Sequence, residues 1–106
     1  CICYYTLNPV KGVRLILMFN RDENKGRETL PLDFWAGIDE NVLGGFDVNS
    51  QGSWMALNTK TFNFAFLTNY DACDFIQVTD QQFRRGVLIK TFATLDKPVE
   101  NFDELS

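Results

Sequence analysis

The sequence predicts an α+β fold in which antiparallel strands come first and a helix follows them. Two strand–turn–strand patterns lie at 2–19 and 53–69. Each has two short apolar runs separated by residues that favour turns, which is typical of a β-hairpin. A capping-box pattern and a helical stripe of apolar residues then begin at Thr79.

The first hairpin is predicted from the apolar runs 2–7 and 13–19, because 8–12 between them contains proline and glycine. The next stretch, 23–31, is polar and is predicted to be a loop. At 42–45, a brief strand is expected to end at its two glycines, Gly44 and Gly45.

The second hairpin is predicted from strands at 53–58 and 62–69, with a turn at 47–52 before it and 59–61 joining its strands. Phenylalanines recur at every second position of the second strand and therefore share one face of it: Phe62, Phe64 and Phe66. This pattern suggests a sheet that helices cover on one face, with a reverse face that packs less tightly or against a second sheet.

The helix is expected to start with Thr79 as its N-cap and Gln82 reaching back to it. Its apolar stripe consists of Phe83, Val87, Leu88, Phe92 and Leu95. Residues 96–98 stop the helix, and 101–105 resemble the start of another. Since these elements do not complete a two-layer domain, we expect 1–106 to be a single partial domain. A partner chain or a missing C-terminal half is expected to cover the rest.

Composition excludes several classes of function. The net charge of −4 argues against nucleic-acid binding, which requires a basic surface. No apolar run is long enough for a transmembrane helix, and the start lacks the charged region of a targeting peptide. The glycines are too few and too poorly spaced for a phosphate loop or a dinucleotide site.

The cysteine and histidine counts restrict the chemistry further. Three cysteines, Cys1, Cys3 and Cys73, have no paired spacing, and histidine is absent. A disulfide framework and a structural zinc site are therefore not expected, and neither is any cofactor. Reduced thiols in the cytoplasm or the mitochondrion are the expected state. Without histidine, a nucleophile must use another base.

Cys1 is the strongest candidate for that nucleophile. If it is the mature N-terminus, with any targeting segment removed, one residue carries both a thiol and an α-amino group that can act as its base. Asn20-Arg21-Asp22-Glu23 follows the second apolar run and offers a cation, two carboxylates and an amide. Alternatively, Cys1 is simply the first residue of the stretch at hand, with a longer chain before it.

An ordered set of motifs resembles one family. The motifs are Cys1-Ile2-Cys3, Asn20-Arg21-Asp22-Glu23, Phe34-Trp35, Gly44-Gly45-Phe46-Asp47, Gly52-Ser53-Trp54-Met55-Ala56-Leu57, Leu67-Thr68-Asn69-Tyr70 and Arg85-Gly86. In this order and spacing they resemble the Asn-Arg-Asp-Glu proteins, also called the transport and Golgi organisation protein 2 family. Because its members are much longer, this chain resembles their N-terminal half only.

That family is similar in turn to the N-terminal-nucleophile hydrolases, which implies half of a four-layer αββα sandwich. In the cysteine branch of those hydrolases, the penicillin and bile-salt acylases, the first cysteine attacks an amide carbonyl. The resemblance implies that Cys1 is the nucleophile, that Asp22 orients its amine, and that the Asn69 amide donates to the oxyanion. A small amide or acyl compound would be the substrate.

The arginine departs from the acylase pattern. There, the arginine beside the thiol lies two positions ahead of Arg21, where this chain has Phe19. Positions 19 and 21 share a strand face, so Arg21 can take that place geometrically; it can equally be a surface cation.

Structural roles stay open for the other candidates. Asp22 and Glu23 also fit solvated residues at a strand end, and Asn69 fits a turn residue. Trp35 and Trp54 fit core anchors better than ligand platforms. Cys3 and Cys73 fit inert apolar fillers, and Arg85 fits a surface or capping interaction.

Two other functions remain as alternatives to a cysteine amidohydrolase. The first is an inactive family member that binds haem or lipid in trafficking. Because histidine is absent, haem would need cysteine, methionine or tyrosine as its ligand, or none. The second is an accessory subunit of a larger assembly, for example a mitochondrial one, since an uncovered half-domain tends to aggregate.

Overall fold

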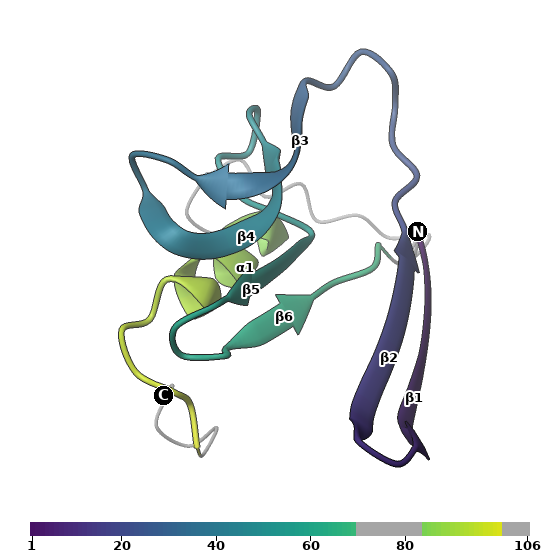
Figure 1. Ribbon diagram of the computed structural model, residues 1–106. Helices are drawn as coiled ribbons and strands as arrows, with labels where there is room; N and C mark the ends of the chain where they lie inside the picture. The colour runs from purple at the N-terminus through teal and green to yellow at the C-terminus, as the bar shows by residue number, and fades with distance from the viewer. Residues whose placement is uncertain (70–83, 101–106) are drawn as a thin grey trace.

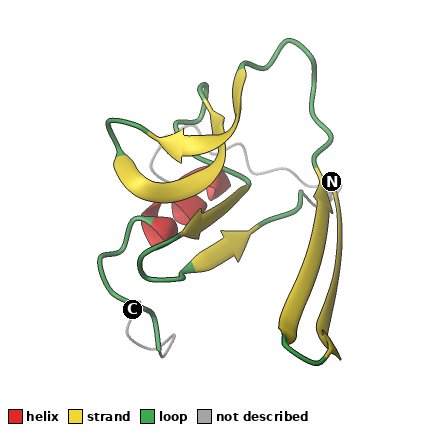
Figure 2. Ribbon diagram, viewed as in Figure 1, coloured by secondary structure: helices red, strands yellow, loops and turns green. Residues whose placement is uncertain are grey.

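The computed structural model describes residues 1–69 and 84–100, which form two antiparallel sheets and a helix (Figure 1, Figure 2). The two-stranded sheet pairs β1 (Ile2–Val10) with β2 (Val13–Asn20). The four-stranded sheet has the order β3 (Thr29–Trp35), β4 (Asp39–Asp47), β5 (Met55–Asn58) and β6 (Phe64–Phe66). The helix, α1 (Arg85–Ala93), packs on β5 and β6. The predicted α+β class is therefore confirmed.

The first predicted hairpin is confirmed, but its turn is shorter than expected. Residues 8–10, expected in the turn, belong to β1, and the strand pairing shifts between Leu7 and Val10. Asn8 has a φ of 49° at this irregularity. Gly12 has a φ of 86° and completes the tight turn that leads into β2, a conformation that glycine adopts without strain.

Two predictions about the middle of the chain are wrong in part. The expected loop at 23–31 ends at Thr29, where β3 begins, and Pro31 is tolerated because β3 is an edge strand. The glycines do not end β4, which continues to Asp47. They allow close packing instead: a Cβ on Gly45 would collide with the ring of Trp54, and one on Gly44 would lie 2.7 Å from the Met55 carbonyl oxygen.

The second predicted hairpin and the turn before it are confirmed, but its strands are shorter than the predicted 53–58 and 62–69, since β5 begins at Met55 and β6 covers only Phe64–Phe66. Asp47 and Gly52 exchange backbone hydrogen bonds across the turn at 47–52. β5 pairs with β6 antiparallel, with Leu57 opposite Phe64 and Met55 opposite Phe66. Phe62 does not join their face, because its φ of 62° places it in the turn with 76% of its surface exposed.

The core lies between α1 and one face of the four-stranded sheet. Strand alternation and register place Val42 and Ala56 on this face, and Ile89 and Ala93 of α1 cover them. The buried core residues are Trp35, Val42, Phe46, Ala56, Ile89 and Ala93. The Leu57–Phe64 pair points to the opposite face, so the helix covers the face away from Phe64 and Phe66.

The helix differs from its predicted boundaries and stripe. α1 begins at Arg85 after an extended Arg84, so Thr79 is not its N-cap; Thr79, like Cys73 and the second helix expected at 101–105, lies outside the described residues. Leu88 is 64% exposed although it belonged to the predicted stripe. Ile89 and Ala93 are buried instead, because the approach of the Gly86 carbonyl to Ser53 sets the rotation of the helix.

Two buried asparagines attach the C-terminal segment to the second hairpin. The Asn58 side chain donates to the Ala93 carbonyl at 2.8 Å, at the end of α1. The Asn63 side chain donates to the Lys97 carbonyl at 2.9 Å and accepts from the Val99 N–H at 3.0 Å. These side chains satisfy backbone groups that the helix end and the following segment would otherwise leave unpaired.

Replacing Val42 by alanine is expected to lower the free energy of unfolding by about 2 kcal/mol. Val42 is fully buried, so the change removes apolar contacts and leaves a cavity. Val10→Ala is the matched control, since Val10 is 63% exposed and its truncation should cost less than about 0.5 kcal/mol. Urea unfolding measures both variants, and equal losses would contradict this placement of the core.

Candidate functional site

The Cys1 end of the first hairpin is the starting point of the candidate site. Ile2 pairs with Asn20 and Cys3 with Phe19, so Cys1 and Arg21 are the residues that flank the last strand pair at the open end of the hairpin. Odd-numbered positions here share one face. Phe19 on this face contacts Phe66 of β6 edge to face, with ring centroids 6.1 Å apart. Cys1 directly precedes β1 and is half-buried.

Arg21 attaches this end of the hairpin to the four-stranded sheet. Its guanidinium lies 4.1 Å from the centroid of the Trp54 ring, a cation–π contact. It also pairs with the carboxylates of Asp47 at 3.5 Å and Glu23 at 3.7 Å. Its side chain is only 18% exposed. Arg21 is therefore held by three neighbours and is not a free surface cation.

Asp47 is the centre of this polar network, although the sequence predicted it only as the start of a turn and as part of a family motif. Its carboxylate accepts from Arg27 Nε at 2.7 Å and from the Ser50 N–H at 3.1 Å. Burial by itself would raise the pKa of Asp47. The hydrogen bond from Ser50, the hydrogen bond and charge of Arg27, and the charge of Arg21 outweigh burial and hold that pKa below its ordinary value.

Asp22 and Asn69 are both exposed. Among the residues that the structure describes, no ion pair joins Asp22 to the α-amino group of Cys1. The carboxylate of Glu23 already has two partners, since it pairs with Arg21 and accepts a hydrogen bond from the Asn24 N–H at 2.9 Å. The roles of Cys1, Asp22 and Asn69 therefore stay predictions.

Trp54 connects the hairpin to the segment that leads to Asn69. The Leu67 N–H donates to the Trp54 carbonyl at 2.9 Å, just after β6. Arg21 lies over the ring of the same residue. Phe19, near the open end of the hairpin, contacts Phe66, the last residue of β6. The segments that carry Cys1, Arg21 and Asn69 thus meet around Trp54, which the sequence analysis expected to be a core anchor.

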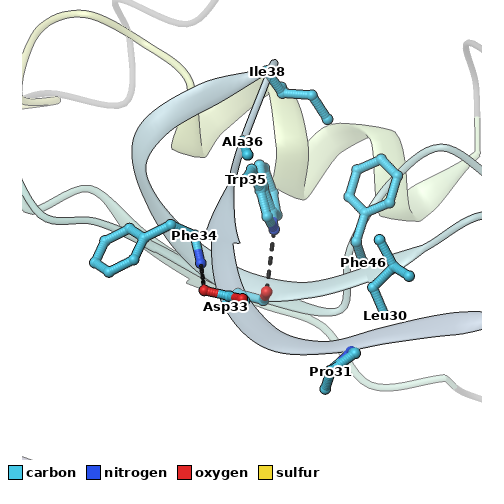
Figure 3. Close-up of a pocket in the computed structure, with 9 residues that line it drawn as sticks. Leu30, Pro31, Asp33, Phe34, Trp35, Ala36, Ile38 and Phe46 are labelled. Carbon is cyan, nitrogen blue, oxygen red and sulfur yellow. Dashed lines mark hydrogen bonds between the residues drawn. The ribbon is translucent and has the colours of Figure 1, made fainter.

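A second feature is an apolar cavity of about 280 Å³ between β3 and β4 (Figure 3). Its walls include Leu30, Phe34, Ile38 and Phe46, and Asp33 is the charged residue among those lining it. Trp35 also lines it and donates from Nε1 to the Gly44 carbonyl at 3.2 Å. Trp35 is therefore both a core residue, as predicted, and part of a cavity wall.

Within 1–69 and 84–100, no group of three or more histidine, cysteine or acidic side chains is placed to hold a metal ion. No helix in the same part of the chain is long and apolar enough to span a bilayer. The thiols of Cys1 and Cys3 are both free.

Comparison with known proteins gives one consistent result. A family model described as Transport and Golgi organisation 2 matches residues 1–106. The chain is 35% identical over 103 residues to the "Transport and Golgi organization protein 2 homolog" of Homo sapiens, and 36% identical over 103 residues to that of Bos taurus. The "Transport and Golgi organization 2 homolog" of Mus musculus is 33% identical over 105 residues.

Each of these matches covers 91% of this chain but only 36% of the relative. The chain therefore spans about a third of the length of these curated relatives. No solved structure matches the chain.

Asp47→Asn is expected to lower the free energy of unfolding at pH 7 by about 2 kcal/mol, because a charged hydrogen-bond acceptor is lost. Because the pKa of Asp47 is lowered in the folded protein, ionised Asp47 stabilises the fold at pH values above its ordinary pKa of 3.8. This stabilisation is lost as the pH falls below that value. As the pH is lowered from 5 to 2, the free energy of unfolding should therefore fall less for Asp47→Asn than for the unsubstituted protein.

Urea unfolding at these pH values measures the difference. Glu40→Gln, at an exposed carboxylate near the start of β4, is the control and should follow the unsubstituted protein. An unchanged acid dependence in Asp47→Asn would show that the network does not stabilise ionised Asp47.

Proposed function

This chain belongs to the Transport and Golgi organisation 2 family, and on that premise we propose that it carries the nucleophile of a cysteine hydrolase acting on a small amide or acyl substrate. One observation carries the proposal: Trp54 is contacted both by Arg21 and by the backbone of Leu67. This double contact supports a site that combines the Cys1 end of the hairpin with the segment leading to Asn69.

The proposed reaction begins with proton transfer from the Cys1 thiol to its own α-amino group. The sulfur then attacks the carbonyl carbon, and the resulting oxyanion accepts a hydrogen bond from the Asn69 amide. Collapse of this intermediate breaks the bond to the leaving amine or alcohol, which takes the proton from the ammonium group. Water then hydrolyses the thioester and releases the acid.

Asp22 and Arg21 have different roles in this proposal. Asp22 accepts a hydrogen bond from the α-amino group once substrate closes the site, since such contacts are often loose without substrate. Arg21 positions the hairpin end, because Trp54, Asp47 and Glu23 already occupy its guanidinium. An odd number of cysteines without paired spacing favours a reducing compartment, either the cytoplasm or the mitochondrion.

An apolar-ligand carrier is the second candidate function, and the cavity between β3 and β4 supports it. Its volume of about 280 Å³ and its largely apolar walls suit a hydrocarbon or aromatic group. In this alternative the chain binds lipid or haem in trafficking and does not hydrolyse it. No histidine is present to ligate haem, so the apolar walls would supply most of the affinity.

The hydrolase proposal predicts that iodoacetamide alkylates Cys1 at least about tenfold faster than Cys3, because the adjacent amine removes the thiol proton. Peptide mass spectrometry follows both sites in one sample, and N-terminal sequencing verifies that the Cys1 amine is free. Asp22→Asn should slow alkylation of Cys1, whereas Glu40→Gln should not. Equal rates at Cys1 and Cys3 would contradict the proposal.

The carrier alternative predicts a saturable change in Trp35 emission on titration with haem or a long-chain acyl-CoA. Trp54→Phe removes the other tryptophan and keeps an aromatic ring beside Arg21. Ile38→Asn, in the cavity wall, should weaken binding about tenfold through lost apolar contact. Leu88→Asn, at an exposed apolar position on α1, is the matched control. Unchanged emission with both ligands would remove this alternative.

A further inference from the structure

The β1–β2 hairpin is apolar on both of its faces. On the outer face, Tyr4 and Met18 lie opposite each other and are 58% and 59% exposed. On the face towards the four-stranded sheet, Leu7 and Leu15 form another such pair, with 65% and 43% of their surfaces exposed. A strand that is apolar on both faces is typical of a sheet that other elements cover on both sides.

The hairpin has few charged residues along its length that would prevent pairing with other strands. Within 2–20, the charged residues are Lys11 and Arg14, both at the turn end. Exposed edge strands usually carry charged residues or extra prolines along their length, which prevent unwanted pairing. A two-stranded ribbon is also only marginally stable by itself. The hairpin thus has the pattern of an inner element of a larger sheet.

Contacts with the rest of the described chain do not cover the hairpin. Its aromatic and ionic contacts with the four-stranded sheet are at its open end, where Phe19 meets Phe66 and Arg21 meets Trp54 and Asp47. Towards its turn, the hairpin extends away from the four-stranded sheet (Figure 1). Phe66 itself remains 36% exposed.

The length of the relatives indicates what covers these faces. Most of each relative lies outside the stretch that this chain matches, since the match covers 36% of it. We propose that the hairpin is a docking surface for the remaining polypeptide of a family member, which pairs strands with its free edges and covers both faces. A second copy of this chain fits less well, because one two-fold contact would cover one face and leave the other exposed. This inference does not depend on the hydrolase chemistry.

The test compares the 106-residue chain with a chimera in which it replaces the matched stretch of the human relative. Hydrogen exchange of the backbone amides at 2–20, followed by mass spectrometry, reports coverage of the hairpin. We expect exchange at least about tenfold slower in the chimera. The amides of β4 and β5 serve as the internal reference, because both strands are paired on two sides in the chain alone.

Single substitutions test the two faces separately. Ile16→Lys on the outer face and Leu15→Lys on the other should each restore fast exchange of the hairpin in the chimera. Phe62→Lys is the matched control, since Phe62 is an exposed apolar residue in the β5–β6 turn. It should leave exchange of the hairpin unchanged.

Two results would overturn the inference. In the first, hairpin amides exchange equally fast in the chimera and in the chain alone while the reference amides stay protected. In the second, the chain alone is a dimer by light scattering and its hairpin is already protected, which assigns the surface to a second copy. Unprotected reference amides in the chimera would mean that the chimera is not folded. In that case the unmatched part of the human relative is co-expressed with the 106-residue chain as a separate polypeptide. Hairpin exchange as fast as in the chain alone then also overturns the inference.

Discussion

The contact of Arg21 with Trp54 and Asp47 is the interaction on which the candidate site depends. It attaches the open end of the first hairpin to the four-stranded sheet, and Cys1 lies at that end. The contact is partly buried, and hydrogen bonds from Arg27 and Ser50 fix the Asp47 carboxylate in place beside Arg21. The Asn-Arg-Asp-Glu motif therefore has a clear structural role, whatever chemistry Cys1 performs.

Close backbone approach and buried amides position the other elements. A Cβ on Gly52 would collide with the backbone of Gly86, so the turn after β4 sits directly on the start of α1. At the other end of the helix, Asn58 and Asn63 bind the backbone of Ala93, Lys97 and Val99. Such side chain–backbone bonds stabilise the arrangement without a large apolar core, which suits a helix of nine residues.

The local elements were largely predictable, and the errors have physical causes. Alternation and turn residues identified both hairpins, because these signals are local. β3 was missed because Pro31 reads as a breaker unless the strand is known to lie at an edge. β4 continues through Gly45, which packs against the ring of Trp54 from the following segment, a contact that no local pattern shows. Similarly, Leu88 is exposed because packing at Gly86 sets the rotation of the helix.

By itself, the sequence determined the α+β class, the presence of both hairpins, and the family. Each of these depends on neighbours along the chain or on an ordered set of motifs. Only the tertiary structure decided that Asp47 is the partner of Arg21 and Arg27, and which sheet face the helix covers. Ion pairs and face selection join residues that are far apart in the sequence, so they follow from how the sheets and the helix pack and not from any local pattern.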